Sequence, residues 1–313
     1  MYSITVIIPV YHAELTLPDL YQQLIPAMES ITTDFEVIFV EDCGKDNCWQ
    51  IIQEIANRDK RVIGIKLSKN YGQHNALLCG IRAATKDIII TMDDDLQNPV
   101  SEISILINKL NEGYDVVYGY PEKGQHGLFR NLASRITKRA LQGAMGVDTA
   151  RHVSAFRAFY TRLRGAFANY HNSTVSIDVL LTWATTNFST VIVKHSPRTA
   201  GQSNYTLPKL IIHALNLMTG FSALPLHLAS ALGIIFTIFG FGVLGWVIAM
   251  YFMYGVIVPG FAFLASIIAI FSGVQLFVLG IFGEYLARIH FRTLDRPTYL
   301  VWQTARQNER LDK

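Results

Sequence analysis

The sequence is poor in cysteine and nearly balanced in charge. Its three cysteines, Cys43, Cys48 and Cys79, are odd in number and lack the spacing of a metal site, so we interpret them as reduced cytosolic thiols. The net charge of +3 is too small to indicate a nucleic-acid partner. Residues 1–10 form a strand-like apolar run without a basic leader or a cleavage site, so we expect no signal peptide.

One long stretch lacks charge altogether. From Leu210 to Gly283 the chain contains no Asp, Glu, Lys or Arg. Because about 20 apolar residues cross a bilayer, we predict two membrane spans, at residues 226–252 and 261–283. Lys and Arg precede the first span and follow the second, which predicts a multi-pass protein of the inner (plasma) membrane with both termini and the N-terminal domain in the cytoplasm. The alternative is a very apolar soluble helical hairpin.

Common signatures of nucleotide-binding proteins and hydrolases are also absent. The sequence has neither a Walker loop nor a GxSxG nucleophile elbow. A Gly-x-Gly-x-x-Gly pattern occurs at Gly240, Gly242 and Gly245, but it lies within the first predicted span. We therefore interpret it as close helix packing and reject a dinucleotide fingerprint. Any bound phosphate must be held by metal and side chains.

Strands and helices alternate through the first 195 residues. We predict strands near residues 3–10, 35–40, 62–67, 87–92, 115–120, 153–160 and 187–195, with helices near 14–28, 46–57, 73–84 and 128–145. This alternation is typical of βαβ units and predicts an α/β fold, a mostly parallel, doubly wound sheet covered by helices on both faces. The predicted domains are a catalytic domain (1–206), an interfacial amphipathic helix (207–225), two transmembrane helices (226–283) and a cytosolic tail (284–313).

Three consecutive acids end the most apolar of these strands. Residues 88–99 read IIITMDDDLQNP, and ligands of open α/β sheets bind beyond the carboxyl ends of the strands. Asp93 and Asp95 are two apart, so they project together and form a ligand pair for Mg²⁺ or Mn²⁺ carrying a diphosphate. The alternative is a solvated acidic turn in which Asp95 or Asn98 caps the next helix.

A second strand end carries Asp42. All ends of parallel strands lie on one edge of the sheet, so Asp42 should share a crevice with the three acids. Its carboxylate can accept the imide N–H of uracil, and together these groups suggest a nucleotide-sugar site. A helix cap is the simpler alternative for Asp42 alone.

Motifs spread from residue 4 to about 300 resemble a known family. They are 6–11 (VIIPVY), 70–76 (NYGQHNA), 93–99 (DDDLQNP), 113–117 (GYDVV), 201–205 (GQSNY) and 280–289 (GIFGEYLARI). The chain resembles the membrane-anchored family-2 glycosyltransferases that charge polyprenyl phosphate with a sugar. That group includes dolichol-phosphate mannose synthase and undecaprenyl-phosphate 4-deoxy-4-formamido-L-arabinose transferase.

The resemblance implies a GT-A domain with assigned site residues. It places Asp42 on uracil, and Asp93 and Asp95 with Gln97 on Mg²⁺ or Mn²⁺ and the diphosphate. Further nucleotide contacts are implied for Pro9, Tyr11, Glu14, Asn70, Gln73 and Asp94. The phosphates and the lipid phosphate are implied to meet Arg130, Arg157, Arg198 and Ser203. For Arg130, a solvated or lipid-facing basic helix is an equal alternative.

The sequence departs from the family at the position of the usual catalytic acid. Family members often carry an acidic residue before the Phe-Arg motif, where this chain has Ser154. A phosphate monoester has a second pKa near ~6, so the acceptor is already largely a dianion and needs little deprotonation. We hypothesise that Asp178 supplies a carboxylate near the sugar; the alternative is a charge at a helix N-terminus.

The predicted function is therefore inverting, metal-dependent transfer of a sugar from a UDP-sugar to undecaprenyl (polyprenyl) phosphate, for cell-envelope glycan or lipid modification. The predicted partners are the donor, the acceptor and membrane lipid, and a homo-oligomer is possible because the spans present small and apolar faces. Three alternatives remain. A processive polysaccharide synthase needs a Gln-x-x-Arg-Trp motif, which is absent. A degenerate nucleotide-binding scaffold conflicts with the intact acids, and a transporter conflicts with the scarcity of polar residues in the spans.

Overall fold

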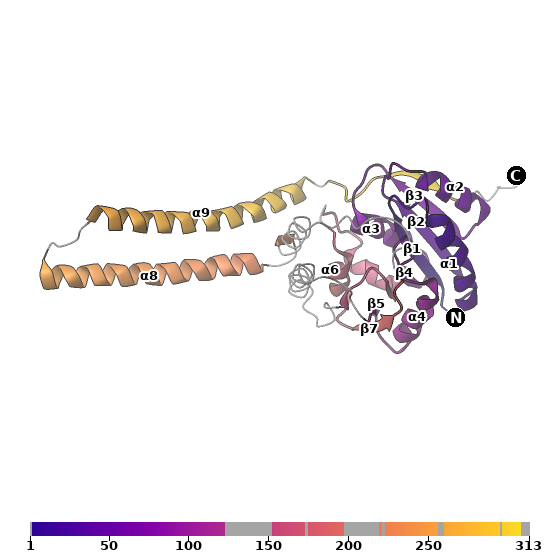
Figure 1. The fold of residues 1–313 in the computed structure, drawn as a ribbon, viewed down its shortest axis with the longest axis horizontal. Helices are drawn as coiled ribbons and strands as arrows, with labels where there is room; N and C mark the ends of the chain where they lie inside the picture. Colours follow the sequence, from indigo (N-terminus) through magenta and orange to yellow (C-terminus); the bar gives the residue numbers. More distant parts are fainter. Residues whose placement is uncertain are drawn as a thin grey trace. The chain divides into compact units, whose positions relative to one another are not determined.

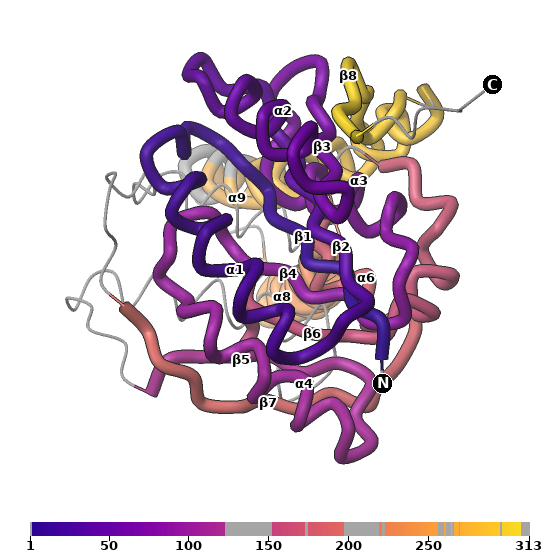
Figure 2. Tube along the Cα trace, turned by 90° about the vertical axis from the view of Figure 1, so that its right-hand side faces the viewer, coloured from indigo at the N-terminus to yellow at the C-terminus, as the bar shows by residue number. Residues whose placement is uncertain are grey.

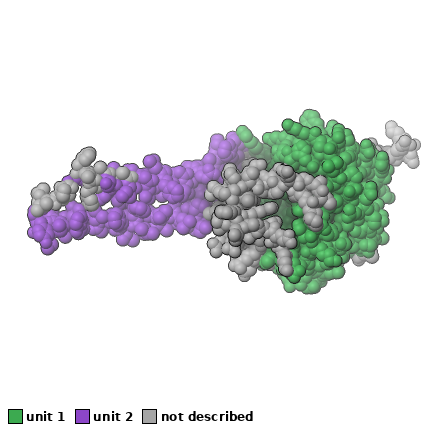
Figure 3. Space-filling model, in the orientation of Figure 1, with its two compact units in different colours: residues 1–214, 295–313 green, residues 215–294 purple. Residues whose placement is uncertain are grey.

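The computed structural model describes residues 2–122, 152–172, 175–196, 219–220, 223–255, 260–294 and 296–307. The chain forms two compact units (Figure 3). The first comprises residues 1–214 and 295–313, and the second comprises residues 215–294. The predicted interfacial helix (207–225) and the predicted basic helix (128–145) fall largely or wholly outside the described residues.

The first unit is built on an eight-stranded sheet with the order β7-β5-β6-β4-β1-β2-β3-β8. Figures 1 and 2 show this sheet running through the unit, with β8 beside β3. Strands β3, β2, β1 and β4 are mutually parallel, as are β5 and β7, whereas β6 and β8 run antiparallel to their neighbours. The strands are Ile4–Val10 (β1), Phe35–Glu41 (β2), Val62–Leu67 (β3), Ile88–Thr91 (β4), Val116–Pro121 (β5), Arg157–Tyr160 (β6), Phe188–Val193 (β7) and Val301–Ala305 (β8).

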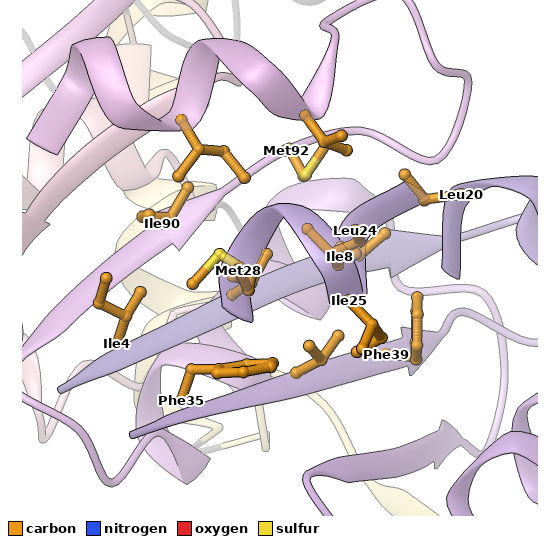
Figure 4. Close-up of a cluster of buried hydrophobic side chains, with 14 of the residues drawn as sticks. Ile4, Ile8, Leu20, Leu24, Ile25, Met28, Phe35, Phe39, Ile90 and Met92 are labelled. Carbon is orange, nitrogen blue, oxygen red and sulfur yellow. The ribbon is translucent and has the colours of Figure 1, made fainter. Parts of the chain in front are cut away.

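The predicted α/β class with a mostly parallel sheet is confirmed. Every residue of β1 and β2 is buried, as expected for central parallel strands covered on both faces. Helices α1 (Leu17–Ile31), α2 (Cys48–Arg58) and α4 (Ile103–Asn111) pack on one face and share one apolar cluster. In Figure 4, Ile4 and Ile8 of β1 lie against Leu24 and Met28 of α1. A short 3₁₀ turn, η1 (Val100–Glu102), leads into α4.

The opposite face is covered by α3 (Gln73–Ala83), α6 (Ile177–Thr182) and the 3₁₀ segment η3 (Thr161–Phe167), which contact one another. Helix α3 lies unusually close to the sheet. A Cβ atom at Gly80 would stand 2.4 Å from Cγ2 of Ile7 on β1, closer than carbon atoms can approach. Glycine at this position therefore fixes the distance between α3 and β1.

Strand β8 was not predicted; residues 284–313 were expected to be a tail. It pairs with β3, and the segment before it is held by Arg82 of α3. The Arg82 guanidinium donates to Thr298 Oγ1 at 3.3 Å and to the carbonyl of Tyr170 at 2.6 Å. The chain thus leaves the first unit for the two long helices and returns to its sheet edge.

The second unit consists of two long helices, α8 (Leu224–Tyr254) and α9 (Gly260–Thr293), which run side by side (Figure 1). They pack through aromatic rings, with Phe271 lying 5.9 Å from Phe236 and 6.4 Å from Phe239 between ring centroids. Both helices are long and apolar enough to cross a membrane. Helix α9 continues ten residues past residue 283, the predicted end of the second span. In this continuation Glu284 and Arg288 form an ion pair one turn apart at 2.8 Å, a spacing that stabilises a helix.

Candidate active site

The carboxyl ends of β1, β2 and β4 lie at one edge of the sheet, and each leads into a tight turn. Each turn contains a residue other than glycine with positive φ: His12 (56°), Cys43 (54°) and Leu96 (58°). A left-handed backbone is unfavourable for such residues and clusters at functional sites in proteins. Three such turns at one edge mark it as the candidate site predicted from the sequence.

The three acids follow β4, and each has a different neighbour. Gln73 at the start of α3 donates its side-chain N–H to Asp93 Oδ1 at 2.6 Å. The backbone N–H of Tyr11, just after β1, donates to Asp94 Oδ2 at 3.0 Å. Asp95 Oδ1 accepts the backbone N–H of Gln97 at 3.1 Å. The acids are therefore held by the neighbouring β1 and α3 ends as well as by their own turn.

Asp94 lies between two further carboxyl groups in a poorly solvated position. Burial raises the pKa of Asp94 to about 7, and the adjacent charges of Asp93 and Asp95 add to the rise. A cation bound close to these residues would favour the charged form of Asp94.

Asp42 follows β2 and is almost completely buried. Its two carboxylate oxygens accept the backbone N–H groups of Tyr71 and Gly72, each at 2.7 Å. Burial raises the pKa of Asp42, and these two hydrogen bonds oppose the rise. Gly72 has φ of 90°, a conformation that glycine adopts without strain. Asp42 thus fixes the loop that leads into α3; its predicted contact with uracil stays a prediction.

The other predicted nucleotide contacts lie around the same edge. Glu14 accepts both the backbone and the side-chain N–H of Asn47, at 3.0 and 3.2 Å, and so ties the turn after β1 to the turn after β2. Pro9 is within β1, and Asn70 is exposed in the loop before α3. Their contacts with a nucleotide stay predictions.

Arg157 and Asp178 are brought together in the structure, although 21 residues separate them in sequence. They form an ion pair in which Arg157 is 1% and Asp178 6% exposed. Arg157 Nε also donates to Thr91 Oγ1 at 2.9 Å, and the Tyr118 hydroxyl donates to Asp178 Oδ1 at 3.1 Å. Burial and the charge of Asp178 raise the pKa of Tyr118 well above its ordinary value, so the phenol remains a donor.

This pairing gives both residues a structural role. A buried guanidinium already neutralised by a carboxylate has no free charge for a lipid phosphate, and a carboxylate so paired is not free for a sugar. The phosphate contact predicted for Arg157 and the sugar contact predicted for Asp178 thus gain no support here. The predicted phosphate ligands Arg130, Arg198 and Ser203 lie outside the described residues.

A comparison with protein families identifies the domain that carries this edge. Residues 5–170 match the model of the family "Glycosyl transferase family 2", which covers more than half of the chain. The chain belongs to glycosyl transferase family 2. It is therefore a glycosyltransferase, and the acids after β4 lie within the matched region.

Solved structures support the fold of this family 2 domain. The chain is similar to glucosyl-3-phosphoglycerate synthase from Mycobacterium tuberculosis in complex with Mn²⁺, UDP and phosphoglyceric acid, with a TM-score of 0.50, 17% identity and coverage of 70% of this chain and 76% of that one. A weaker similarity relates it to TarS from S. aureus, with a TM-score of 0.46, 16% identity and coverage of 71% and 73%. The first similarity establishes the Rossmann-like GT-A fold.

The family 2 site is suited to a metal that arrives with its substrate. Among the described residues no group of three or more His, Cys, Asp or Glu side chains is arranged to hold a metal. Mg²⁺ commonly binds through one or two carboxylates and completes its coordination with substrate phosphates. Asp93 and Asp95, two carboxylates in one turn after β4, fit such an arrangement.

Sequence reasoning missed two residues that organise this edge. Thr91 ends β4 and receives the Arg157 hydrogen bond. His74 follows Gln73 and accepts the backbone N–H of Ile177 at 3.3 Å through Nδ1. His74 lies within the 70–76 motif, which could have indicated it, but neither residue's partner is indicated by the sequence around it.

Proposed function

We propose that this family 2 enzyme transfers a sugar from a UDP-sugar to a polyprenyl phosphate at the cytoplasmic face of a membrane. The observation that carries the proposal is the combination, in one chain, of a GT-A acid cluster and two long apolar helices. A soluble acceptor would not require the second feature. A lipid acceptor requires the enzyme to stay at the bilayer surface.

The membrane part of the proposal is supported by the exposure of the two helices. Many large apolar side chains on α8 and α9 are exposed, among them Phe241 and Trp246 on α8 and Leu276 and Phe277 on α9. Exposed apolar surface of this extent requires an apolar environment. Hydrocarbon is the environment that matches the length of the helices, since a bilayer core is about 30 Å thick. The positive-inside pattern then favours cytoplasmic termini.

The donor side of the proposal rests on the acids after β4. Asp93 and Asp95, with Gln97, would hold Mg²⁺ or Mn²⁺ against the donor diphosphate. A divalent cation bound there would neutralise the charge that develops on the departing diphosphate. The relative from M. tuberculosis was crystallised with Mn²⁺ and UDP, which is consistent with a UDP-sugar donor here.

The transfer itself requires little acid–base chemistry. An oxygen of the lipid phosphate attacks the anomeric carbon, the bond from that carbon to the diphosphate breaks, and UDP departs, with inversion at the carbon. The acceptor phosphate is already largely dianionic at neutral pH, so the enzyme contributes mainly positioning and electrostatic stabilisation. Ser154 in place of an acid is compatible with this chemistry.

A transfer assay tests the proposal. Purified protein in detergent is given undecaprenyl phosphate, Mg²⁺ or Mn²⁺ and a panel of UDP-sugars, and UDP release and glycolipid are followed together. We expect one donor to give both products, with both abolished by chelation and by Asp95→Asn. Asp34→Asn is the matched control, because Asp34 precedes β2 at the opposite edge of the sheet and is exposed.

Three other outcomes of the assay would each contradict a different part of the proposal. UDP release without glycolipid would contradict the lipid acceptor. Binding of UDP without any turnover across the panel would favour the degenerate scaffold, and long polymer in place of a single lipid-linked sugar would favour a polysaccharide synthase.

A further inference from the structure

Helices α3 and α6 are joined at their N-terminal ends by one hydrogen bond to an imidazole. Ile177 is the first residue of α6, and its backbone N–H donates to His74 Nδ1 at 3.3 Å. The first backbone N–H groups of a helix have no partner within the helix, and the N-cap residue, Ser176, provides no side-chain cap. His74 therefore caps α6 from a different helix. An accepting Nδ1 carries no proton, so the neutral ring has its proton on Nε2.

On the α3 side of this hydrogen bond, the neighbouring residue contacts the acids directly. His74 and Gln73 are the first two residues of α3, and Gln73 holds Asp93 Oδ1 at 2.6 Å. A hydrogen bond to one carboxylate oxygen orients the whole carboxylate group. The position of the α3 end thus determines where the Asp93 carboxylate lies.

On the α6 side of this hydrogen bond, the neighbouring residue is connected to β4, the strand that precedes the acids. Asp178 follows Ile177 in α6 and pairs with Arg157 of β6, which donates to Thr91 Oγ1 at 2.9 Å. Thr91 is the last residue of β4. A continuous series of contacts therefore connects Thr91, the last residue of β4, through β6, α6 and α3 to Asp93, two residues further along the chain.

We propose that His74 is a positioning residue that holds the Asp93 carboxylate for the metal–diphosphate complex. This inference rests on the proposed function, because it assumes that Asp93 binds a cation. If the acceptor on His74 is removed, the buried N–H of Ile177 loses its partner and the ends of α3 and α6 are no longer tied. Gln73 then restrains Asp93 less. Groups that orient metal ligands in this way typically change metal affinity or activity by about 10–100-fold when mutated.

The test measures Mn²⁺ binding to the purified full-length protein by electron paramagnetic resonance, in saturating UDP and without acceptor. Gln73→Leu, which removes the direct contact, should weaken Mn²⁺ binding by about 10–100-fold. His74→Leu acts one residue further away and should weaken it by about 3–10-fold, at the lower end of that range. His74→Asn is the matched control: its side-chain oxygen can replace Nδ1 as acceptor, so the affinity should stay within about twofold.

Two further variants separate positioning from general destabilisation. Ile177→Pro removes the donor instead of the acceptor, and proline is tolerated at the first position of a helix; it should weaken Mn²⁺ binding as His74→Leu does. The double variant Gln73→Leu/His74→Leu should bind Mn²⁺ no more weakly than Gln73→Leu alone, because both act through Asp93. A merely structural role of His74 would give additive losses.

The outcomes distinguish this inference from the proposed function. If the wild-type protein binds no Mn²⁺ with UDP, the proposed metal site fails and the inference fails with it. If the wild type binds Mn²⁺ while His74→Leu and Ile177→Pro bind it equally well, the positioning role is overturned and the proposed function stands.

Discussion

The buried ion pair between Arg157 and Asp178 predicts an unusual pattern of stability losses. Its members are 1% and 6% exposed, so a variant that removes one charge leaves the other buried without a partner. Breaking such a pair costs about 3–5 kcal/mol, whereas replacing both members by apolar residues is often nearly neutral. We therefore expect Arg157→Met and Asp178→Leu each to be strongly destabilising.

The double variant Arg157→Met/Asp178→Leu should be more stable than either single variant. It removes both buried charges, and its remaining cost is the lost acceptor of the Tyr118 hydroxyl, about 1–3 kcal/mol for an unsatisfied buried group. Thr91 retains a partner, because its hydroxyl donates to the carbonyl of Ala155 at 2.6 Å.

Thermal unfolding of the four proteins in one detergent measures this pattern. For a domain of this size 1 kcal/mol corresponds to about 2–4 °C in Tm, so the single variants should unfold roughly 6–20 °C below the wild type. The double variant should recover a large part of that loss. A double variant that loses the sum of the two single losses would show that the two charges do not stabilise each other, contrary to this prediction.

Three further predictions concern other parts of the first unit. Gly80→Ala should destabilise the protein by about 1–3 kcal/mol, because the added methyl group would overlap Ile7; denaturant unfolding should show a lower midpoint, and an unchanged midpoint would contradict the close packing of α3. Hydrogen bonds from Arg61 lower the pKa of Asp59, so Asp59→Asn should cost about 1–2 kcal/mol at pH 7. Because the pKa of Asp59 is lower in the folded state, the wild type is more stable than Asp59→Asn above the ordinary pKa near ~4, and this difference in stability disappears as the pH falls through the lowered pKa. A difference in stability that does not change with pH would exclude the lowered pKa as its cause. Arg82→Met should release the segment before β8 and increase its cleavage in limited proteolysis, whereas an unchanged cleavage pattern would show that β8 pairing alone holds it.

Local sequence patterns predicted the central strands well. Strands β1, β2, β3 and β4 are rich in apolar and β-branched residues, a pattern that burial on both faces favours. The acid cluster was also predictable, because its position after such a run depends only on where the strand ends. The apolar character of α8 and α9 was equally visible, since it depends on composition.

Features that depend on distant partners were not predictable. Strand β8 exists because the chain returns to pair with β3 after α9, and nothing local to residues 301–305 indicates that partner. The neutralisation of Arg157 by Asp178 likewise joins residues from β6 and α6. A charged residue in a strand-like segment is normally read as exposed or functional, and only the fold reveals that it is buried with a counter-charge.

The proposed function requires that the lipid phosphate receives the sugar. Phosphorus NMR of undecaprenyl phosphate, incubated with the enzyme, a divalent cation and the UDP-sugar donor, observes that group directly. We expect the monoester signal to decline while a phosphodiester signal and UDP grow in equal amounts. Consumption of the donor with an unchanged monoester signal would rule out the lipid phosphate as acceptor, because the sugar would then have gone to water or to another acceptor.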